Sequence, residues 1–296
     1  MSANGQTDTL PAGKVLVAVA LFLALTALFS AGAYVLVLQL GLLRYYIALL
    51  MWAPGLAALL SCRVMGVKTA SLGWRWGNPR WTVAGYLLPV IYGVIAYGLI
   101  WQLGLGGMGN TGFVVDLGRY LGLSGWSDGA TLAFGIAILA TVGMIWHVAT
   151  ALGEEIGWRG FLMPQLMRVM PFPLAALVTG LVWSLWHVPL IYYTTYNAGP
   201  VNLNLQMAYF TLLTVGLSFI MGYLRLRSGS LWPAAVLHAA HNALVLSILQ
   251  PMTVQYADTW RYANEFGLVL PVVVASFGLV AWYRASKEGL TGPIRE

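Results

Sequence analysis

Charged residues are scarce in this chain, and their scarcity decides its class. Only 8% of the 296 residues are charged, 59% are hydrophobic, and the mean hydropathy is +0.78. Soluble domains carry about 25% charged and about 45–50% apolar residues, so a soluble domain is excluded. The sequence is that of an integral membrane protein. Its net charge of +6 therefore reports loop orientation rather than affinity for nucleic acid.

Cysteine and several protease motifs are also missing. Cys62 is the single cysteine, so an intrachain disulfide is excluded and no cysteine cluster can bind zinc. The sequence has no H-E-x-x-H motif of a zinc protease and no G-x-S-x-G turn for a serine nucleophile. No aspartate lies inside an apolar run, which argues against an intramembrane aspartyl protease.

Eight apolar runs are long enough to cross a membrane as helices, which takes about 20 residues each. They cover roughly residues 15–38, 45–60, 81–103, 130–152, 172–193, 205–226, 231–249 and 266–282. The first run is longer than the core of a signal peptide, so we expect an uncleaved anchor. The predicted fold class is an all-α, polytopic membrane helix bundle.

We divide this single membrane domain into three parts. Residues 1–129 hold the N-terminal transmembrane helices and loops, residues 130–250 the predicted catalytic core, and residues 251–296 the last helix and tail.

Lysine and arginine gather in alternate connections between the runs. Twelve of the fifteen fall on one side: Lys14, Arg63, Lys68, Arg75, Arg80, Arg159, Arg168, Arg225, Arg227, Arg284, Lys287 and Arg295. Arg44, Arg119 and Arg261 fall on the other side. Because positively charged loops stay in the cytoplasm, we expect both termini there, in a multi-pass protein of the cell membrane.

Two acidic residues stand beside apolar runs, where a charge costs several kcal/mol. Glu154 and Glu155 adjoin the fourth run, whereas the other acids, including Glu265, fall in tails or loops. Glu155 and Arg159 are four residues apart and can pair on a helix, while Glu154 points about 100° away. A purely structural ion pair is the alternative interpretation.

All four histidines lie within the apolar runs. His238 and Asn242 are four residues apart and share a helix face, whereas His241 lies off that face and should support them. His147 precedes Glu154 by about two turns and could line the same cavity. Each of these residues could also be a hydrogen-bonded packing residue.

His187 lies on a further helix, one turn after Trp183. A carboxylate, imidazoles and an amide on three helices can activate a water and stabilise an oxyanion, which are the parts of a hydrolytic site. One difficulty is depth, because His187 lies about fifteen residues into its helix and His238 about seven. At 1.5 Å per residue the two would differ in depth by roughly 12 Å.

The motifs on these three helices resemble those of the CAAX prenyl protease 2 family, also called the CPBP or abortive-infection family. The matching motifs are E-E-x-x-x-R at Glu154–Arg159, aromatic-x-x-x-H at Trp183–His187 and H-x-x-x-N at His238–Asn242. The resemblance covers about residues 130–250. Trp183 departs from the family pattern, which often has phenylalanine at this position.

The resemblance implies an intramembrane endopeptidase whose eukaryotic relatives trim prenylated CAAX chain ends. It implies that Glu154 is the general base and that His187 helps to bind the water. It also implies an oxyanion hole formed by His238 and Asn242. The supporting residues would be Glu155, Arg159 and Trp183.

The family resemblance favours a glutamate mechanism without a cofactor. Zinc held by Glu154, His187 and His238 is the alternative. The expected partners are the lipid bilayer and a membrane-tethered or lipidated peptide, bound in an apolar cavity with cytoplasmic access.

Two other functions stay open. One is a non-catalytic membrane immunity protein or scaffold that keeps the fold. The other is a proton-coupled transporter, although the sequence shows no paired, broken half-helices of the inverted-repeat type.

Overall fold

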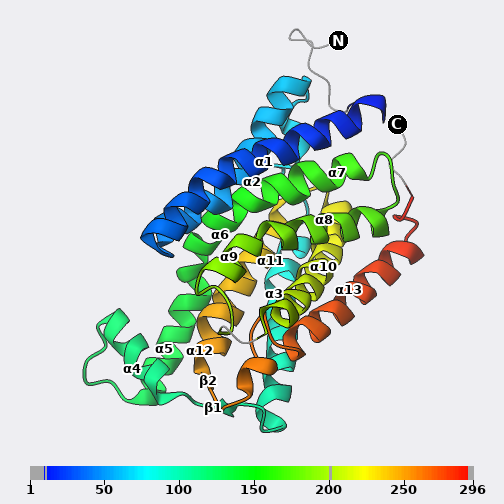
Figure 1. Cartoon of the computed structure of the whole chain (residues 1–296). Coiled ribbons are helices and arrows are strands. Elements are labelled where there is room, and N and C mark those ends of the chain that lie inside the picture. Colours follow the sequence, from blue (N-terminus) through cyan, green and yellow to red (C-terminus); the bar gives the residue numbers. More distant parts are fainter. Residues whose placement is uncertain (1–9, 11, 200–201, 293–296) are drawn as a thin grey trace.

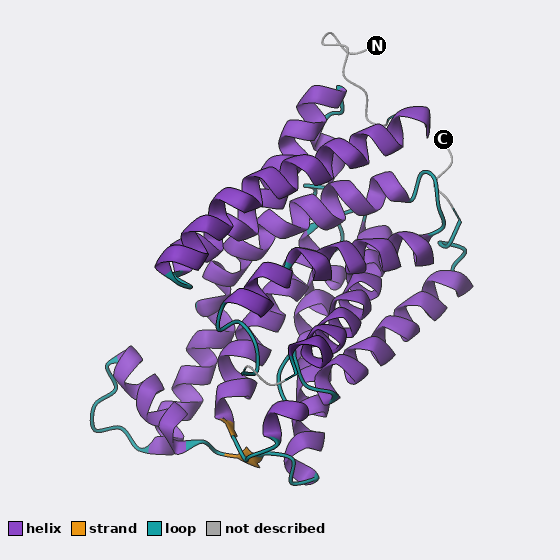
Figure 2. Cartoon of the chain, in the orientation of Figure 1, coloured by secondary structure: helices purple, strands orange, loops and turns teal. Residues whose placement is uncertain are grey.

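The computed structural model describes residues 10, 12–199 and 202–292 of the chain. Within this part, eight helical segments are long and apolar enough to cross a membrane, which confirms the predicted bundle. Figure 2 shows how completely helices dominate the architecture.

The membrane-spanning segments of the described chain are built from fourteen helical pieces. They are α1 (Ala12–Leu40); α2 (Arg44–Met65); α3 (Pro79–Gln102); α5 (Asp128–Thr141), α6 (Gly143–Glu155), η2 (Ile156–Leu162) and α7 (Met163–Leu166) in one run; α8 (Phe172–Trp186) with α9 (Val188–Tyr193); α10 (Leu203–Ser228); α11 (Trp232–Ala240), η3 (His241–Leu249) and α12 (Gln250–Met252) in one run; and α13 (Val269–Lys287).

The connections hold the remaining elements: η1 (Thr69–Leu72), α4 (Thr111–Leu121), η4 (Thr259–Arg261), β1 (Gly107–Met108) and β2 (Thr253–Val254). The two short strands pair antiparallel, with Gly107 opposite Val254. In Figure 1 the beginning of α1 and the end of α13 lie at one end of the bundle, while α4, β1 and β2 lie at the opposite end.

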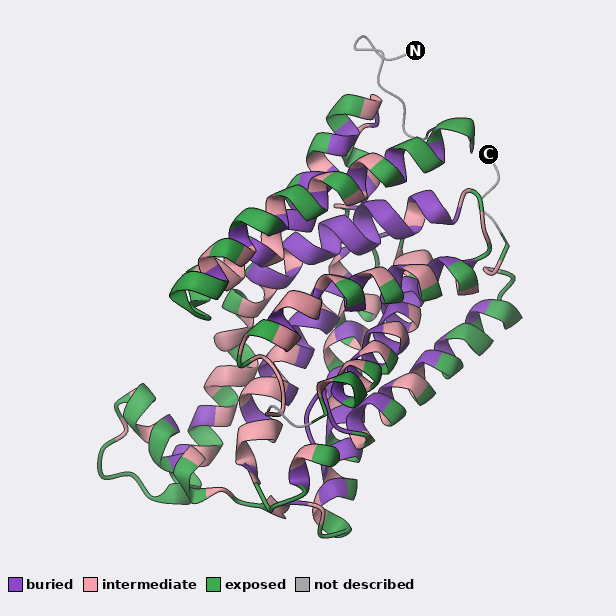
Figure 3. Ribbon diagram, in the orientation of Figure 1, coloured by how far each residue is buried: buried purple, intermediate pink, exposed green. Residues whose placement is uncertain are grey.

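Residue choice explains where several helices begin and end. Asn78 caps α3 by accepting a hydrogen bond from the backbone N–H of Arg80, and Pro79 occupies the first turn, where its missing N–H costs nothing. At the end of α2, Gly66 adopts the left-handed conformation (φ 70°) that terminates a helix. Figure 3 shows exposed residues along the outer faces of α1 and α13, where apolar side chains can meet lipid.

The fourth span is longer than predicted. The sequence predicts its end at residue 152, but the helical segment runs from Asp128 to Leu166. Charges at 154, 155 and 159 lower the hydropathy there, yet these side chains are buried and paired inside the protein. Arg159 was therefore wrongly placed in a connection, because it lies in η2 with no exposed surface.

A close approach of α2 and α6 sets the position of Glu154. A Cβ atom on Gly153 would lie 2.7 Å from the backbone oxygen of Met51, and one on Gly55 would lie 2.6 Å from the backbone oxygen of Gly153. Small residues allow membrane helices to pack this closely. The carboxylate beside Gly153 is thus anchored by a backbone-to-backbone contact.

We expect Gly153→Ala to destabilise the protein by about 1–3 kcal/mol, because the added methyl overpacks this crossing. Thermal unfolding in detergent measures the loss. Gly98→Ala in α3 is the matched control, since a Cβ there meets nothing within 4 Å, and it should leave stability unchanged or slightly raised. Equal melting temperatures for the two variants would contradict the close packing.

Candidate active site

One cavity collects the polar residues that the sequence singled out. It has a volume of about 450 Å³, and its wall includes Glu154, Trp183, His187, His238, His241 and Asn242. His187 and His238 therefore meet in the same space despite their different positions along their helices. His147 also lines this cavity, as predicted.

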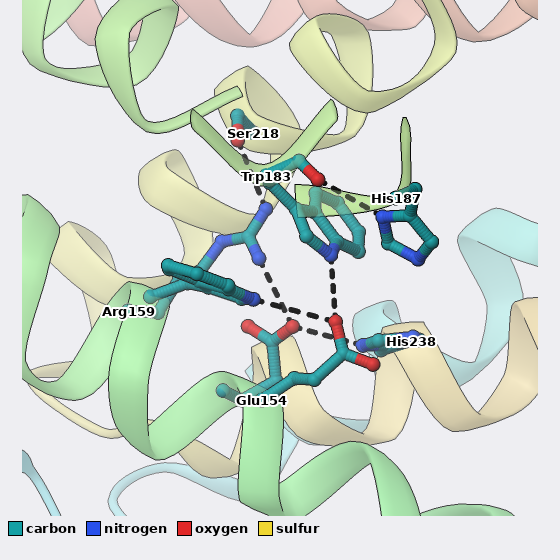
Figure 4. Close-up of polar contacts among 8 residues, drawn as sticks. Glu154, Arg159, Trp183, His187, Ser218 and His238 are labelled. Atoms are coloured by element: carbon teal, nitrogen blue, oxygen red, sulfur yellow. Dashed lines mark hydrogen bonds and ion pairs between the residues drawn. The ribbon is translucent and has the colours of Figure 1, made fainter. Parts of the chain in front are cut away.

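Glu154 is held by two indole groups. The Nε1–H groups of Trp183 and Trp158 both donate to Oε2 of Glu154, at 2.6 Å and 3.3 Å. The glutamate is 2% exposed, at the end of α6. Figure 4 shows its carboxylate facing Trp183 on one side and His238 on the other. Both observed donors bind one oxygen, so the carboxylate is oriented.

Glu155 has a different set of partners, as the sequence predicts. Its Oε1 accepts hydrogen bonds from Nη1 of Arg159 at 3.0 Å and from Nδ1 of His238 at 2.9 Å. Arg159 also donates to the Ser218 hydroxyl at 3.0 Å, and its guanidinium carbon lies 4.4 Å from the ring centre of Trp183. The predicted Glu155–Arg159 pair is thus present and fully buried.

The hydrogen bonds of the histidines indicate which ring nitrogen is available. Nδ1 of His187 lies 2.9 Å from the backbone oxygen of Trp183. A carbonyl oxygen only accepts hydrogen bonds, so Nδ1 carries the proton and Nε2 keeps a lone pair in the neutral ring. For the same reason Nδ1 of His238 donates to Glu155.

Two π-helical stretches shape the site. η2 begins directly after Glu155, and η3 begins at His241 and contains Asn242. A π-helix has more residues per turn than an α-helix, so it turns side chains to new directions, and such stretches are frequent at functional sites. The sequence gives no obvious signal for either stretch.

Glu265 is a cavity residue that the sequence analysis missed. It was placed in a loop and set aside; the structure confirms the loop but buries the side chain to 6% exposure at the cavity wall. Its carboxylate accepts hydrogen bonds from the Tyr196 hydroxyl at 3.0 Å and from Nε2 of His241 at 3.2 Å. His241 also contacts the Tyr92 hydroxyl at 2.8 Å, so it anchors this loop.

The surroundings of the Glu265 carboxylate shift its pKa. Burial by itself would raise the pKa of Glu265, but the hydrogen bonds and charge of His241 and the hydrogen bond from Tyr196 outweigh it and hold the pKa below its usual range. Burial, reinforced by the Glu265 charge, raises the pKa of Tyr196 well above its ordinary value. This tyrosine therefore stays protonated and remains a donor.

The cavity lies toward the end of the bundle opposite the chain termini. Leu42 and Arg44 at the α1–α2 connection, Tyr196 after α9 and Glu265 before α13 all line it. Toward the termini it is backed by Trp158 and Arg159, neither of which has exposed surface. Cytoplasmic termini and cytoplasmic access to the cavity, both expected from the sequence, stay predictions.

The arrangement of ligand-type residues bears on the zinc alternative. Among the described residues, no three side chains of His, Cys, Asp or Glu converge as ligands of one metal ion. The zinc alternative uses Glu154, His187 and His238 as ligands. In the structure, Oε2 of Glu154 accepts two indole hydrogen bonds. Zinc binding thus stays an untested prediction.

Comparison with known families identifies the core of the chain. Residues 134–244 match the family model Rce1-like, described as type II CAAX prenyl endopeptidase Rce1-like. All three motifs fall inside this match, which confirms the resemblance inferred from them. Residues 134–244 are thus an Rce1-like domain of a multi-pass integral membrane protein, and the family indicates a peptidase of the CAAX type. The comparison with curated proteins finds no match.

Arg159→Met should destabilise the protein strongly, because it leaves the Glu155 carboxylate buried without its cation. Breaking a buried ion pair costs about 3–5 kcal/mol. Thermal unfolding in detergent is the measurement. The control is Arg119→Met, which removes an exposed pair with Asp116 and should change stability very little. Similar stabilities for both variants would show that the buried pair is dispensable.

Proposed function

We propose that the protein is an intramembrane endopeptidase that hydrolyses a peptide bond of a membrane-tethered substrate with a glutamate-activated water. The observation that carries this proposal is the setting of Glu154. Its carboxylate is buried in the wall of an apolar cavity, fixed through one oxygen, and accompanied by His187 and His238. Residues 130–250 would form the catalytic core, with α2 and Glu265 completing the cavity wall.

Water activation uses the two acceptors that the site offers. Because the indoles bind Oε2 of Glu154, the lone pairs of its Oε1 can accept a hydrogen bond from a water. Nε2 of His187 can accept a hydrogen bond from the second O–H of the same water, since Nδ1 carries the ring proton and donates it to the backbone oxygen of Trp183. Glu154 would remove a proton as the water oxygen attacks the peptide carbonyl, and would then deliver that proton to the leaving amine.

Charge that develops on the peptide oxygen would be met by His238 and Asn242. Nδ1 of His238 already donates to Glu155, so donation from Nε2 requires the doubly protonated ring. The negative charge of Glu155 stabilises the imidazolium of His238, as the aspartate of a Ser-His-Asp triad stabilises the protonated histidine. Asn242 lines the same cavity, and its amide can supply a second donor.

Glu154→Gln is the decisive variant, since an amide cannot take up the proton of the water. We expect the cleavage rate of a membrane-tethered peptide in liposomes to fall by at least about 10²-fold. The matched control is Glu288→Gln, whose carboxylate pairs with Arg227 outside the cavity and should cleave normally. Undiminished cleavage by Glu154→Gln would refute the mechanism.

The same cleavage assay distinguishes the metal-free mechanism from the zinc alternative. A metal-free enzyme keeps its activity after treatment with a strong chelator, whereas a zinc enzyme loses it and regains it on addition of zinc.

Trp183→Phe tests the hydrogen bond that the family's more frequent phenylalanine cannot make. The ring is kept, but the 2.6 Å donor to Glu154 is lost. Because a hydrogen bond to a charged group contributes about 1.5–3 kcal/mol, we expect kcat to fall roughly 10-fold or more. Trp101→Phe removes an indole bond to Thr253 and should not affect kcat. An unchanged kcat in Trp183→Phe would mean that this bond does not orient the base.

A further inference from the structure

Aromatic rings enclose the side chain of His187. The ring of Tyr196 stacks on it, with ring centres 6.0 Å apart and an angle of 25° between the planes. Phe210 of α10 and Trp186 of α8 meet it edge to face, each with ring centres 4.8 Å apart. Its Nδ1 is bound to the backbone oxygen of Trp183 (Figure 4). The direction of Nε2, the nitrogen proposed to hold the water, therefore depends on these neighbours.

The stacked ring of Tyr196 is held from the far end of the chain. Tyr196 lies in the connection between α9 and α10, outside any helix. Its hydroxyl donates to Oε2 of Glu265 at 3.0 Å. The next residue, Phe266, packs against both Tyr196 and Phe210, with ring centres 5.4 Å apart in each case. Glu265 and Phe266 thus support two of the rings that contact His187.

A local turn explains why both of these side chains face the protein interior. Asn264 adopts the left-handed conformation (φ 62°), which asparagine tolerates better than most residues. Its Oδ1 accepts a hydrogen bond from the backbone N–H of Phe266 at 2.7 Å, which closes the turn. Glu265 and Phe266 are consequently 6% and 5% exposed, although they lie in the connection before α13.

The second oxygen of Glu265 reaches the helix that carries Asn242. Oε1 accepts a hydrogen bond from Nε2 of His241 at 3.2 Å, and Nδ1 of His241 lies 2.8 Å from the Tyr92 hydroxyl of α3. His241 is the first residue of η3, and Asn242 follows it directly. An ionised carboxylate can accept from both partners at once, and the lowered pKa of Glu265 keeps it ionised.

We propose that Glu265 is a positioning residue for the reaction: through Tyr196 it orients His187, and through His241 it fixes the start of η3, where Asn242 lies. This inference rests on the proposed function, because it takes His187 and Asn242 as catalytic residues. Both oxygens of Glu265 accept a hydrogen bond from a side chain, which suits positioning rather than the role of a second base. Glu265 lies beyond residues 134–244, so the family match assigns it no role.

The test compares two substitutions of Glu265. Glu265→Leu keeps a side chain of similar length but removes both acceptors. In Glu265→Gln the amide oxygen can still accept from Tyr196, and the amide nitrogen can donate to the other tautomer of His241, because the Tyr92 hydroxyl can accept as well as donate. The glutamine variant therefore restores the geometry without the charge.

Cleavage of the membrane-tethered peptide in liposomes is the first measurement. We expect Glu265→Leu to lower kcat by about 10- to 100-fold, because small misplacements of groups at the reacting centre carry costs of this size. KM should stay nearly unchanged, since the apolar wall that would bind the peptide is kept. Glu265→Gln should retain most of the wild-type kcat. A wild-type kcat in Glu265→Leu, or equal losses in both variants, would overturn the positioning role.

Two further variants separate positioning from a general loss of structure. Glu288→Leu is the matched control, since Glu288 also accepts a tyrosine hydroxyl, from Tyr223 at 3.0 Å, but outside the cavity; its kcat should equal that of the wild type. Tyr196→Phe keeps the stacked ring and removes only the hydroxyl, so it tests the contact with His187 even where Glu265→Leu does not fold. Its kcat should fall, and an unchanged kcat would contradict the link through Tyr196.

Hydrogen exchange in detergent gives a measurement that does not depend on cleavage. Glu265→Leu should speed exchange of the backbone amides at residues 187–199 and 241–249, because segments that lose their anchoring contacts open more often. Exchange in α1 should be unchanged. Wild-type exchange at both segments would overturn the inference even if Glu154→Gln abolishes cleavage. Cleavage by Glu154→Gln, in turn, would refute the proposed function and leave the exchange result standing.

Discussion

The buried ion pair between Glu155 and Arg159 is the interaction on which the site depends. Neither side chain has exposed surface, so the protein itself must satisfy both charges. Three other helices each contribute one partner to the pair: His238 of α11, Ser218 of α10 and the ring of Trp183 of α8. Oε2 of Glu155 and Nε of Arg159 have no hydrogen-bond partner among the described residues. The pair therefore fixes the relative positions of the helices that carry the three motifs, and the cavity forms where they meet.

The two adjacent glutamates divide structural and chemical work between them. Helical geometry at their spacing already separates them by about 100°, which is why the sequence could assign Glu155 to Arg159 and leave Glu154 free. The sequence could not reveal how Glu154 is held. Its two indole donors come from the next turn, at Trp158, and from α8, at Trp183. Trp183 looked like a packing substitute for phenylalanine, and only the tertiary structure shows its N–H as a donor to the carboxylate.

Most of the fold was predictable because lipid requires long apolar helices, and all eight predicted spans are present in the described part of the chain. The exception, the fourth span, shows the limit of hydropathy. Its charged residues end the apolar run in sequence but not in space, since each of them has hydrogen-bond partners inside the protein. Glu265 shows the same limit from the other side: a loop position suggests solvent, yet contacts with His241 and Tyr196, both distant in sequence, bury it.

The side from which the cavity is reached requires a similar combination of local and tertiary information. An even number of spans puts the beginning of α1 and the end of α13 at one face of the bundle, and the basic residues make the cytoplasm the expected side of that face. Cytoplasmic access was expected from the resemblance to enzymes that trim cytoplasmic chain ends, and it stays a prediction because a shared motif does not determine which way a cavity faces. Access depends instead on which connections surround the site. Here Arg44, Tyr196 and Glu265 line the cavity, and the buried ion pair of Glu155 and Arg159 lies behind its wall.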